Sequence, residues 1–254
     1  MRLTTQGLVL REVNYKEADK ILTVLTRDLG KKTVKARGCR RKNSRLAAGS
    51  QLLVYSEVTL NQRGDFWELA EADPQQQFWR VRQDIETLAL ASYFAEVTER
   101  TCQEGEDASE VLSLVLNSLY ALDTLKKPRA LVKAAFELKL LSITGYEPLL
   151  EGCAVCGAQS PQAPRLHLSQ GVLHCAGCRG LMGEGVSMPL SPAALAAARH
   201  IVGGEAKKLF SFQLSPEALT LLARASEAFL MTQQERGFRT LDYYKQLTDK
   251  EWTP

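Results

Sequence analysis

Three short runs near the start of the chain decide the fold. They are TQGLVLREV at Thr5–Val13, ILTVLT at Ile21–Thr26 and KTVKAR at Lys32–Arg37. The first two are apolar and rich in β-branched residues, which is typical of strands. The turn residues Asp28–Lys31 separate the second run from the third. We therefore expect three consecutive strands in one β-domain.

Two further strands complete this region. Ser50–Gln62 forms a long strand-like run, and Arg63-Gly64-Asp65 is interpreted as a hairpin turn that leads into Phe66–Ala72. Five short strands within about 75 residues fit a small barrel such as the OB-fold. The region closes at Pro74, so the predicted barrel domain spans residues 1–76.

A helical pattern follows the barrel. Apolar residues recur at three- and four-residue spacing, and serine–proline pairs mark two later helix starts. The expected helices are Phe78–Cys102, Ser109–Leu125, Arg129–Ile143, one after Ser191-Pro192, and one from Ser215-Pro216 to about Arg236.

The sequence thus predicts an α+β multidomain protein in four segments. Residues 77–149 form the first part of a helical domain and residues 186–254 its C-terminal part. Between them, residues 150–185 are rich in Gly, Pro and Cys, and we interpret them as an inserted metal-binding module.

Four of the six cysteines lie in that module as two pairs. Cys153-Ala-Val-Cys156 and Cys175-Ala-Gly-Cys178 are separated by 18 residues, the spacing of a zinc ribbon. Four thiolates fill a tetrahedral shell and leave no open position, so we expect one structural Zn²⁺. The alternatives are free or disulfide-linked pairs, or a histidine, His167 or His174, in place of one cysteine.

Positive charge is concentrated at the N-terminus. Residues 1–45 hold 13 basic and four acidic residues, whereas the whole chain has a net charge of only +3. Residues 27–45 alone carry nine cations and one acid. Mixed Arg and Lys on a strand and the following loop suit contact with phosphates. We predict that this phosphate-binding surface, the candidate nucleic-acid site, comprises Lys31, Lys32, Lys35, Arg37, Arg40, Arg41, Lys42 and Arg45.

Aromatic residues are sparse in this region. Tyr15, Tyr55, Phe66 and Trp67 are expected mainly to pack, with one of them available for base stacking. Phe66 and Trp67 are neighbours on a strand, so one of them should face the core. The scarcity favours electrostatic binding without sequence preference.

Other classes of protein are disfavoured. The chain lacks a phosphate-binding Gly-x-x-x-x-Gly-Lys motif, a nucleophile elbow and paired catalytic carboxylates, so we expect no enzyme. No run approaches the 18 to 20 apolar residues of a membrane span, and the N-terminus lacks an apolar signal core. We therefore expect a cytoplasmic protein with no membrane partner.

Several stretches resemble the RecO family of recombination mediators. They are Gly7–Arg11, Asn14–Lys31, Lys35–Gly38 with Asn43–Arg45, and Leu140–Pro148 leading into Cys153. The four-cysteine insertion, which only some members keep, also fits. Two departures are that a glycine is common where Lys16 stands, and that Arg40-Arg41-Lys42 carries extra positive charge.

The resemblance implies an N-terminal OB-fold, a helical domain and a zinc module. It also implies a nucleoid-associated protein that binds single- and double-stranded DNA and anneals complementary strands. The implied partners are RecR and the acidic C-terminal tail of single-stranded DNA-binding protein, and RecA is loaded indirectly. We expect the tail to dock in a hydrophobic groove of the helical domain, with Arg129, Lys133 and Lys139 as candidate cations.

Three alternatives stay open. A zinc-dependent nuclease would need an open metal position and acidic ligands. An RNA-binding OB-fold protein with a zinc ribbon would prefer RNA over DNA. A scaffold with a merely solvated basic face would retain no DNA at low salt.

Overall fold

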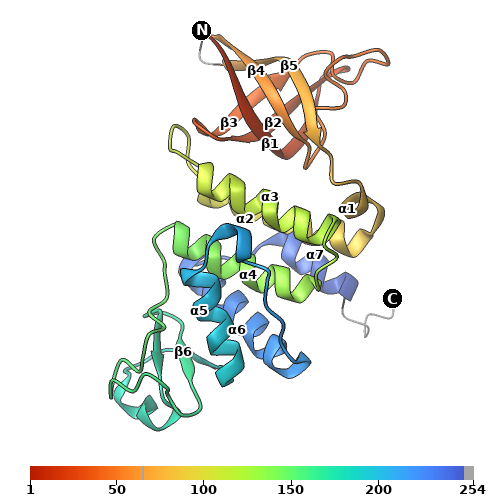
Figure 1. Ribbon diagram of the computed structural model, residues 1–254. Coiled ribbons are helices and arrows are strands. Elements are labelled where there is room, and N and C mark those ends of the chain that lie inside the picture. The colour runs from red at the N-terminus through yellow and green to blue at the C-terminus, as the bar shows by residue number, and fades with distance from the viewer. Residues whose placement is uncertain (65, 249–254) are drawn as a thin grey trace. The chain divides into compact units, whose positions relative to one another are not determined.

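Five strands close into a barrel at the start of the chain (Figure 1). The structure, a computed structural model, describes residues 1–64 and 66–248. The strands are β1 (Arg2–Tyr15), β2 (Asp19–Thr26), β3 (Gly30–Ala36), β4 (Tyr55–Arg63) and β5 (Phe66–Gln76). Their order around the barrel is β1-β2-β3-β5-β4, and only the β3–β5 pair is parallel among these strands.

Alternation along the strands builds the barrel core. Inward-facing residues such as Val9, Leu22, Val34 and Leu60 are at most 2% exposed, while their strand neighbours face outward. The β1–β2 turn places Lys16 at φ 53°, a conformation that favours glycine. Lysine therefore occupies the turn in the conformation that a glycine would adopt there.

Four helices accompany the barrel in the first of two compact units, which comprises residues 1–124 and 238–254. They are α1 (Trp79–Gln83), α2 (Ile85–Thr101), α3 (Ser109–Asp123) and α7 (Arg239–Thr248). Helix α2 packs on β1 and on α7. Asp84 separates α1 from α2 because its side chain accepts a 2.7 Å hydrogen bond from Thr87 N and caps α2.

The second unit spans residues 125–237 and contains three helices and the cysteine module. The helices are α4 (Arg129–Ile143), α5 (Pro192–Gly203) and α6 (Pro216–Gln234). Ser191 and Ser215 cap α5 and α6, each followed by proline, as the sequence predicted. The module lies between α4 and α5 in the chain, and its sheet contacts α6 through β8.

The cysteine module has short regular elements of its own. They are β6 (Arg165–His167), β7 (Val172–His174), η1 (Ala176–Leu181) and β8 (Ser187–Pro189), with sheet order β7-β6-β8. A 3-10 turn, η2 (Ala206–Lys208), follows α5. The predicted fold class is confirmed, since the chain contains the barrel, the helical part and the inserted cysteine module.

Several element boundaries differ from the prediction. Residues 50–54 belong to a loop and not to a strand, because Leu53 has φ 61° and cannot continue a ladder. The helix predicted over Phe78–Cys102 is two helices, and α7 was not predicted. Of the predicted turn Arg63-Gly64-Asp65, the last residue lies outside the described residues, as do residues 249–254 of the predicted last segment. None of the helices in the described ranges has the length and apolar content needed to cross a bilayer.

Candidate nucleic-acid interface and metal centre

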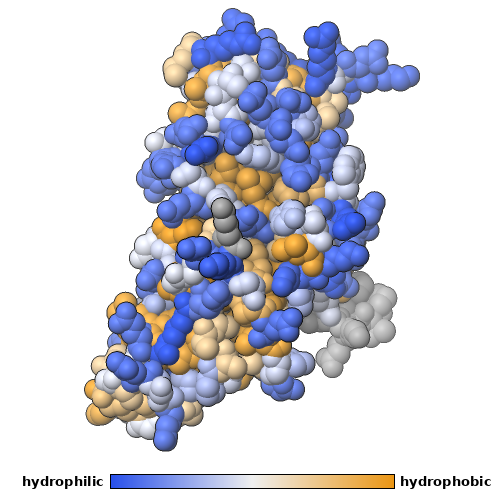
Figure 2. Space-filling view, viewed as in Figure 1, coloured by the Kyte–Doolittle hydropathy of each residue, from blue (hydrophilic) through white to orange (hydrophobic). Residues whose placement is uncertain are grey.

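Residues 37–54, here called the basic loop, connect β3 to β4 as a series of turns. Backbone hydrogen bonds such as Arg41 N to Gly38 O, 3.1 Å, and Ser44 N to Arg41 O, 3.0 Å, define these turns. The loop contains five cations and no Asp or Glu. All five are exposed: Arg37, Arg40, Arg41, Lys42 and Arg45. Figure 2 shows hydrophilic side chains over this loop, which projects from the barrel at the upper right.

Apolar residues hold the basic loop on the barrel. Cys39 is 3% exposed within the barrel core, and Leu46 packs against the same cluster. A Cβ added to Gly49 would lie 2.4 Å from the Cβ of Ala72 on β5, so only glycine permits this close approach. The loop is therefore fixed from below while its cations face solvent.

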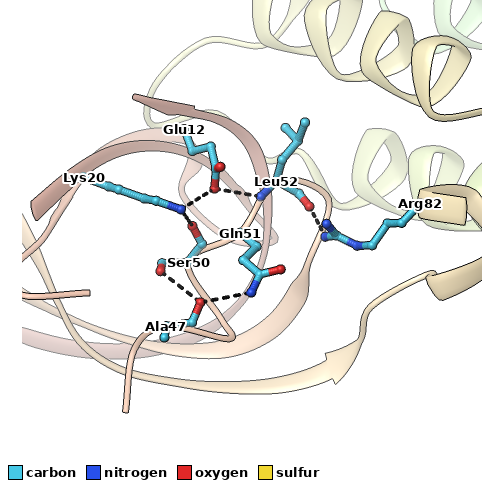
Figure 3. Close-up of polar contacts among 7 residues, drawn as sticks. All are labelled: Glu12, Lys20, Ala47, Ser50, Gln51, Leu52 and Arg82. Atoms are coloured by element: carbon cyan, nitrogen blue, oxygen red, sulfur yellow. Dashed lines mark hydrogen bonds and ion pairs between the residues drawn. The ribbon is translucent and has the colours of Figure 1, made fainter. Parts of the chain in front are cut away.

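A polar network fixes the C-terminal end of the loop (Figure 3). Glu12 Oε2 accepts hydrogen bonds from Lys20 Nζ at 2.8 Å and from Leu52 N at 3.0 Å. Lys20 Nζ also donates to Ser50 O at 3.4 Å. The guanidinium of Arg82 donates to Leu52 O. Strands β1 and β2 and helix α1 thus all bind the same short segment.

The three predicted lysines of β3 are placed differently. Lys31 Nζ donates to Glu99 O at 2.7 Å, Lys32 Nζ lies 3.8 Å from Glu104, and Lys35 Nζ lies 3.3 Å from Asp19. All three are half-buried. Acidic partners partly neutralise the charges of Lys32 and Lys35, and Lys31 is bound to a carbonyl oxygen, so all three offer a phosphate less than the loop cations do.

Arg37 lies between the two groups. Its Nε is 2.6 Å from Glu68 Oε1, yet its side chain remains 65% exposed. An exposed ion pair contributes about 0 to 1 kcal/mol, so a phosphate can compete with Glu68 for this guanidinium. The structure brings Arg37, Arg40, Arg41, Lys42 and Arg45 together on one loop.

The aromatic residues divide as expected. Trp67 packs against the barrel core, whereas Phe66 is 76% exposed, which confirms that one of these neighbours faces inward. Tyr15 is 42% exposed, and Lys35 Nζ lies 5.0 Å from its ring centroid. Sequence reasoning missed this contact, because the two residues lie on different strands and no local pattern connects them.

The four predicted cysteines meet at one point of the second unit. The Sγ atoms of Cys153, Cys156, Cys175 and Cys178 all lie within 4.8 Å of one another. Cys156 Sγ and Cys175 Sγ are 3.8 Å apart. A tetrahedral shell with metal–sulfur bonds of about 2.3 Å has edges of about 3.8 Å, so the donor set fits a four-coordinate ion.

The thiols also favour a cation chemically. Burial alone would raise the pKa of Cys153, but hydrogen-bond donors from Cys156, Cys175 and Val155 outweigh it and lower the pKa to about 6. Burial and the neighbouring thiols of Cys156 and Cys153 raise the pKa of Cys178 to about 12. The Cys153 thiolate therefore forms readily, whereas the Cys178 thiol resists ionisation unless a metal ion stabilises its thiolate.

Neither nearby histidine replaces a cysteine in this cluster. His174 Nδ1 is 2.8 Å from Cys175 O, and its Nε2 is 2.9 Å from Ser187 Oγ, so both ring nitrogens already have partners. His167 is fully buried on β6, where Gly185 leaves room for its ring. Both histidines pack within the module.

Two of the predicted groove cations already have partners within the second unit. Lys133 is 5% exposed, and its Nζ lies 2.7 Å from both Glu137 Oε1 and Glu227 Oε2. Lys139 Nζ donates to Val202 O at 2.8 Å and to Gly204 O at 3.1 Å. The prediction that Lys133 rims a groove is wrong, because it is buried between two carboxylates, whereas the half-buried Lys139 stays a prediction.

Comparison with known proteins identifies the family. The family model "Recombination protein O N terminal" matches residues 1–78, and "Recombination protein O C terminal" matches residues 82–242. The chain belongs to the RecO family. Among curated RecO relatives, the DNA repair protein RecO of Acetivibrio thermocellus is 33% identical over 245 residues, which cover 96% of this chain and 97% of that protein. That of Alkaliphilus metalliredigens is 27% identical, over 97% of this chain and 100% of the relative. The chain is thus a RecO-family DNA repair protein, as its sequence indicated.

Proposed function

We propose that this RecO-family chain binds single- and double-stranded DNA through the basic loop and anneals complementary strands without covalent chemistry. The observation that carries the proposal is the loop itself. Five exposed cations and no acid lie on a segment that is fixed to the barrel by buried side chains. Such an array suits phosphates and contains no element that reads a base sequence.

The eight predicted residues do not contribute equally in this proposal. Arg40, Arg41, Lys42 and Arg45 act as primary phosphate contacts because they are exposed. Arg37 and Lys35 join them when a phosphate displaces their acidic partners, Glu68 and Asp19. Lys31 and Lys32 add to the positive potential of the barrel.

Annealing follows from charge neutralisation. Two strands repel each other because both are polyanions, and a strand held on the loop carries less effective charge. A second strand then approaches at a lower electrostatic cost, and base pairing completes the reaction. No nucleotide hydrolysis is required.

We further propose that the cysteine cluster holds one Zn²⁺ as a structural brace. Four sulfur ligands leave no position for water or substrate, which supports a role in folding. The ion would then stabilise the module, residues 150–185, which has few apolar residues and therefore only a small core. The division of the chain into segments 1–76, 77–149, 150–185 and 186–254 stays a prediction.

The partners are proposed on family grounds. Resemblance to RecO mediators supports binding to RecR and to the acidic tail of single-stranded DNA-binding protein, with RecA loaded as a consequence. Of the three cations considered for the tail, Arg129 and Lys139 stay candidates. A DNA ligand also implies association with the nucleoid.

A strand-annealing assay tests the proposal. Complementary oligonucleotides, each coated with the cognate single-stranded DNA-binding protein, are mixed with the chain and without nucleotide. We expect acceleration by the wild type and its loss in the triple variant Arg40→Glu/Arg41→Glu/Lys42→Glu. Equal rates for the wild type and this variant would refute the proposal.

A matched control variant changes the net charge by the same amount as the loop variant, but in the second unit. Lys126→Glu/Arg224→Glu/Arg236→Glu reverses three exposed cations of the second unit. It should anneal like the wild type.

Two further experiments test the alternative functions. Competition by RNA of the same sequence separates DNA mediation from an RNA-binding role. Oligonucleotides that stay intact after incubation with the chain and divalent cations exclude nuclease activity.

A further inference from the structure

One outer face of the barrel combines aromatic and basic side chains. Strand pairing sets Tyr15 opposite Asp19, and Lys35 opposite Glu68. Directly opposed residues point to the same side of a sheet. Phe66 precedes Glu68 by two residues on β5 and therefore shares that face. Parts of β1, β2, β3 and β5, which are consecutive neighbours in the barrel, thus contribute to this face.

The polar contacts on this face connect its members directly. Lys35 Nζ lies 3.3 Å from Asp19 Oδ2 and 5.0 Å from the centroid of the Tyr15 ring. Lys16 Nζ lies 5.5 Å from the same centroid. On β5, Glu68 forms an ion pair with Arg37, whose Nε lies 2.6 Å from Glu68 Oε1. The face therefore carries cations beside an aromatic ring whose π-surface they polarise.

Both aromatic rings at its edges are available to a ligand. Tyr15 is 42% exposed and Phe66 is 76% exposed, whereas Trp67 is half-buried against the barrel core and Tyr55 Oη hydrogen-bonds Gln6. An isolated exposed aromatic residue is ordinary, but here Tyr15 lies beside Lys16 and Lys35, and Phe66 shares the barrel face to which Lys35 belongs. Neither ring is needed to fill the barrel core.

Their positions in the barrel are also informative. Tyr15 is the last residue of β1 before the β1–β2 turn, and Phe66 is the first residue of β5 after the β4–β5 turn. These two connections border the surface on which OB-folds bind oligonucleotides. A strand that enters from the basic loop and crosses β3 would meet both rings.

We propose that Tyr15 and Phe66 form a base-stacking site for single-stranded DNA, with Lys35 and Arg37 between them at the phosphates. This inference rests on the proposed DNA binding by the basic loop. It specifies how that surface distinguishes single-stranded from double-stranded DNA. Stacking requires an unpaired base, because the faces of paired bases are occupied by their neighbours in a duplex. The site therefore gives a preference for single strands that the loop cations alone cannot give.

The test compares three ligands of equal length: an oligothymidine, a strand of abasic sites and a duplex. For Tyr15→Ala and for Phe66→Ala we expect about tenfold weaker binding of the oligothymidine, a size consistent with stacking on one base. Binding of the abasic strand and of the duplex should stay unchanged, and so should the salt slope. Wild-type affinity of Tyr15→Ala/Phe66→Ala for the oligothymidine would overturn the inference.

Controls separate stacking from folding. Tyr120 on α3 is 44% exposed, so Tyr120→Ala removes an equally exposed ring at another place and should change nothing. Tyr15→Phe should retain wild-type binding, whereas Tyr15→Leu should behave like the alanine variant because it keeps bulk but not the ring. If Tyr15→Leu binds as the wild type does, the ring is not a stacking partner.

The same ligands distinguish the two proposals. A wild type that binds the oligothymidine and the abasic strand equally, and more weakly at high salt, contradicts stacking and leaves phosphate binding by the loop intact. A wild type that binds none of the three at low salt contradicts both. A wild type that prefers the oligothymidine, with the preference lost in the double variant, supports both.

Discussion

Gly38 N donates a 2.8 Å hydrogen bond to Asp19 Oδ1, and this contact fixes the start of the basic loop to the start of β2. Gly38 has φ 62°, a conformation that glycine adopts without strain. Asp19 also forms an ion pair with Lys35, whose Nζ lies 3.3 Å from Asp19 Oδ2. One carboxylate therefore orients both the loop and a cation of the proposed stacking face.

This contact predicts a pH dependence. The amide of Gly38, together with Lys35 and Arg37, holds the pKa of Asp19 below its usual range despite some desolvation. A lowered folded-state pKa means that the ionised carboxylate contributes stability above the unfolded-state pKa of about 3.9. That contribution is lost as the pH falls through the lower folded-state value.

Urea unfolding of the wild type and Asp19→Asn checks this prediction. The wild type should be more stable near pH 7, and the difference should shrink as the pH falls below about 4. A difference that is the same at pH 7 and at pH 3 would show that the charge of Asp19 has no part in it.

Glu12 is predicted to restrain the other end of the loop. Glu12→Ala removes the acceptor of Lys20 Nζ and Leu52 N, so the segment before β4 should open more often. Trypsin should then cleave after Arg40, Arg41 or Lys42 severalfold faster, as measured by mass spectrometry. Glu57→Ala, at an exposed site on β4, is the control and should leave the cleavage rate unchanged.

Lys133 is predicted to be essential for the stability of the second unit. Burial alone would lower the pKa of Lys133, but the carboxylates of Glu137 and Glu227 outweigh burial and raise it. Lys133→Ala leaves the fully buried Glu137 without this cation, which should cost about 3 to 5 kcal/mol in the free energy of unfolding.

Chemical denaturation gives that value directly. Arg224→Ala on the exposed face of α6 should change the free energy of unfolding by less than about 0.5 kcal/mol. A loss of similar size in both variants would mean that the buried charge pair is not the cause.

Removal of the metal should destabilise the second unit and spare DNA binding by the loop. We expect one zinc per chain by elemental analysis, and its loss in Cys153→Ser/Cys175→Ser. A chelator should lower the melting temperature, because metal binding and folding of the module are coupled. If the metal-free chain also loses its salt-dependent affinity for DNA at 10 °C, the ion is more than a brace.

The parts of the fold that depend on local pattern were predictable. The first three strands follow from β-rich runs, the caps of α5 and α6 from Ser-Pro pairs, and the four-cysteine cluster from cysteine spacing. Each of these features is set by residues close together in the chain.

Features set by distant residues were not predictable. Lys32 was predicted to contact phosphate, but folding places Glu104 beside it. The sequence does not indicate which way Lys133 faces, and in the structure α4 is buried on nearly all sides. The sequence indicates that one of Phe66 and Trp67 faces inward but not which one; Phe66 is exposed and Trp67 is half-buried against the barrel core. Tertiary packing decides which of these side chains are paired, buried or exposed. The periodicity of the sequence does not indicate how distant elements pack.

The salt dependence of DNA binding tests the central claim most directly. The logarithm of the binding constant for an oligothymidine is plotted against the logarithm of salt concentration, for the wild type and Arg40→Glu/Arg41→Glu/Lys42→Glu. Loss of three phosphate contacts on a single strand should reduce the steepness of the slope by about 2 and weaken binding at low salt. The control Lys126→Glu/Arg224→Glu/Arg236→Glu should keep the wild-type slope. If the loop variant retains both the slope and the affinity of the wild type, the basic loop is not the DNA-binding surface.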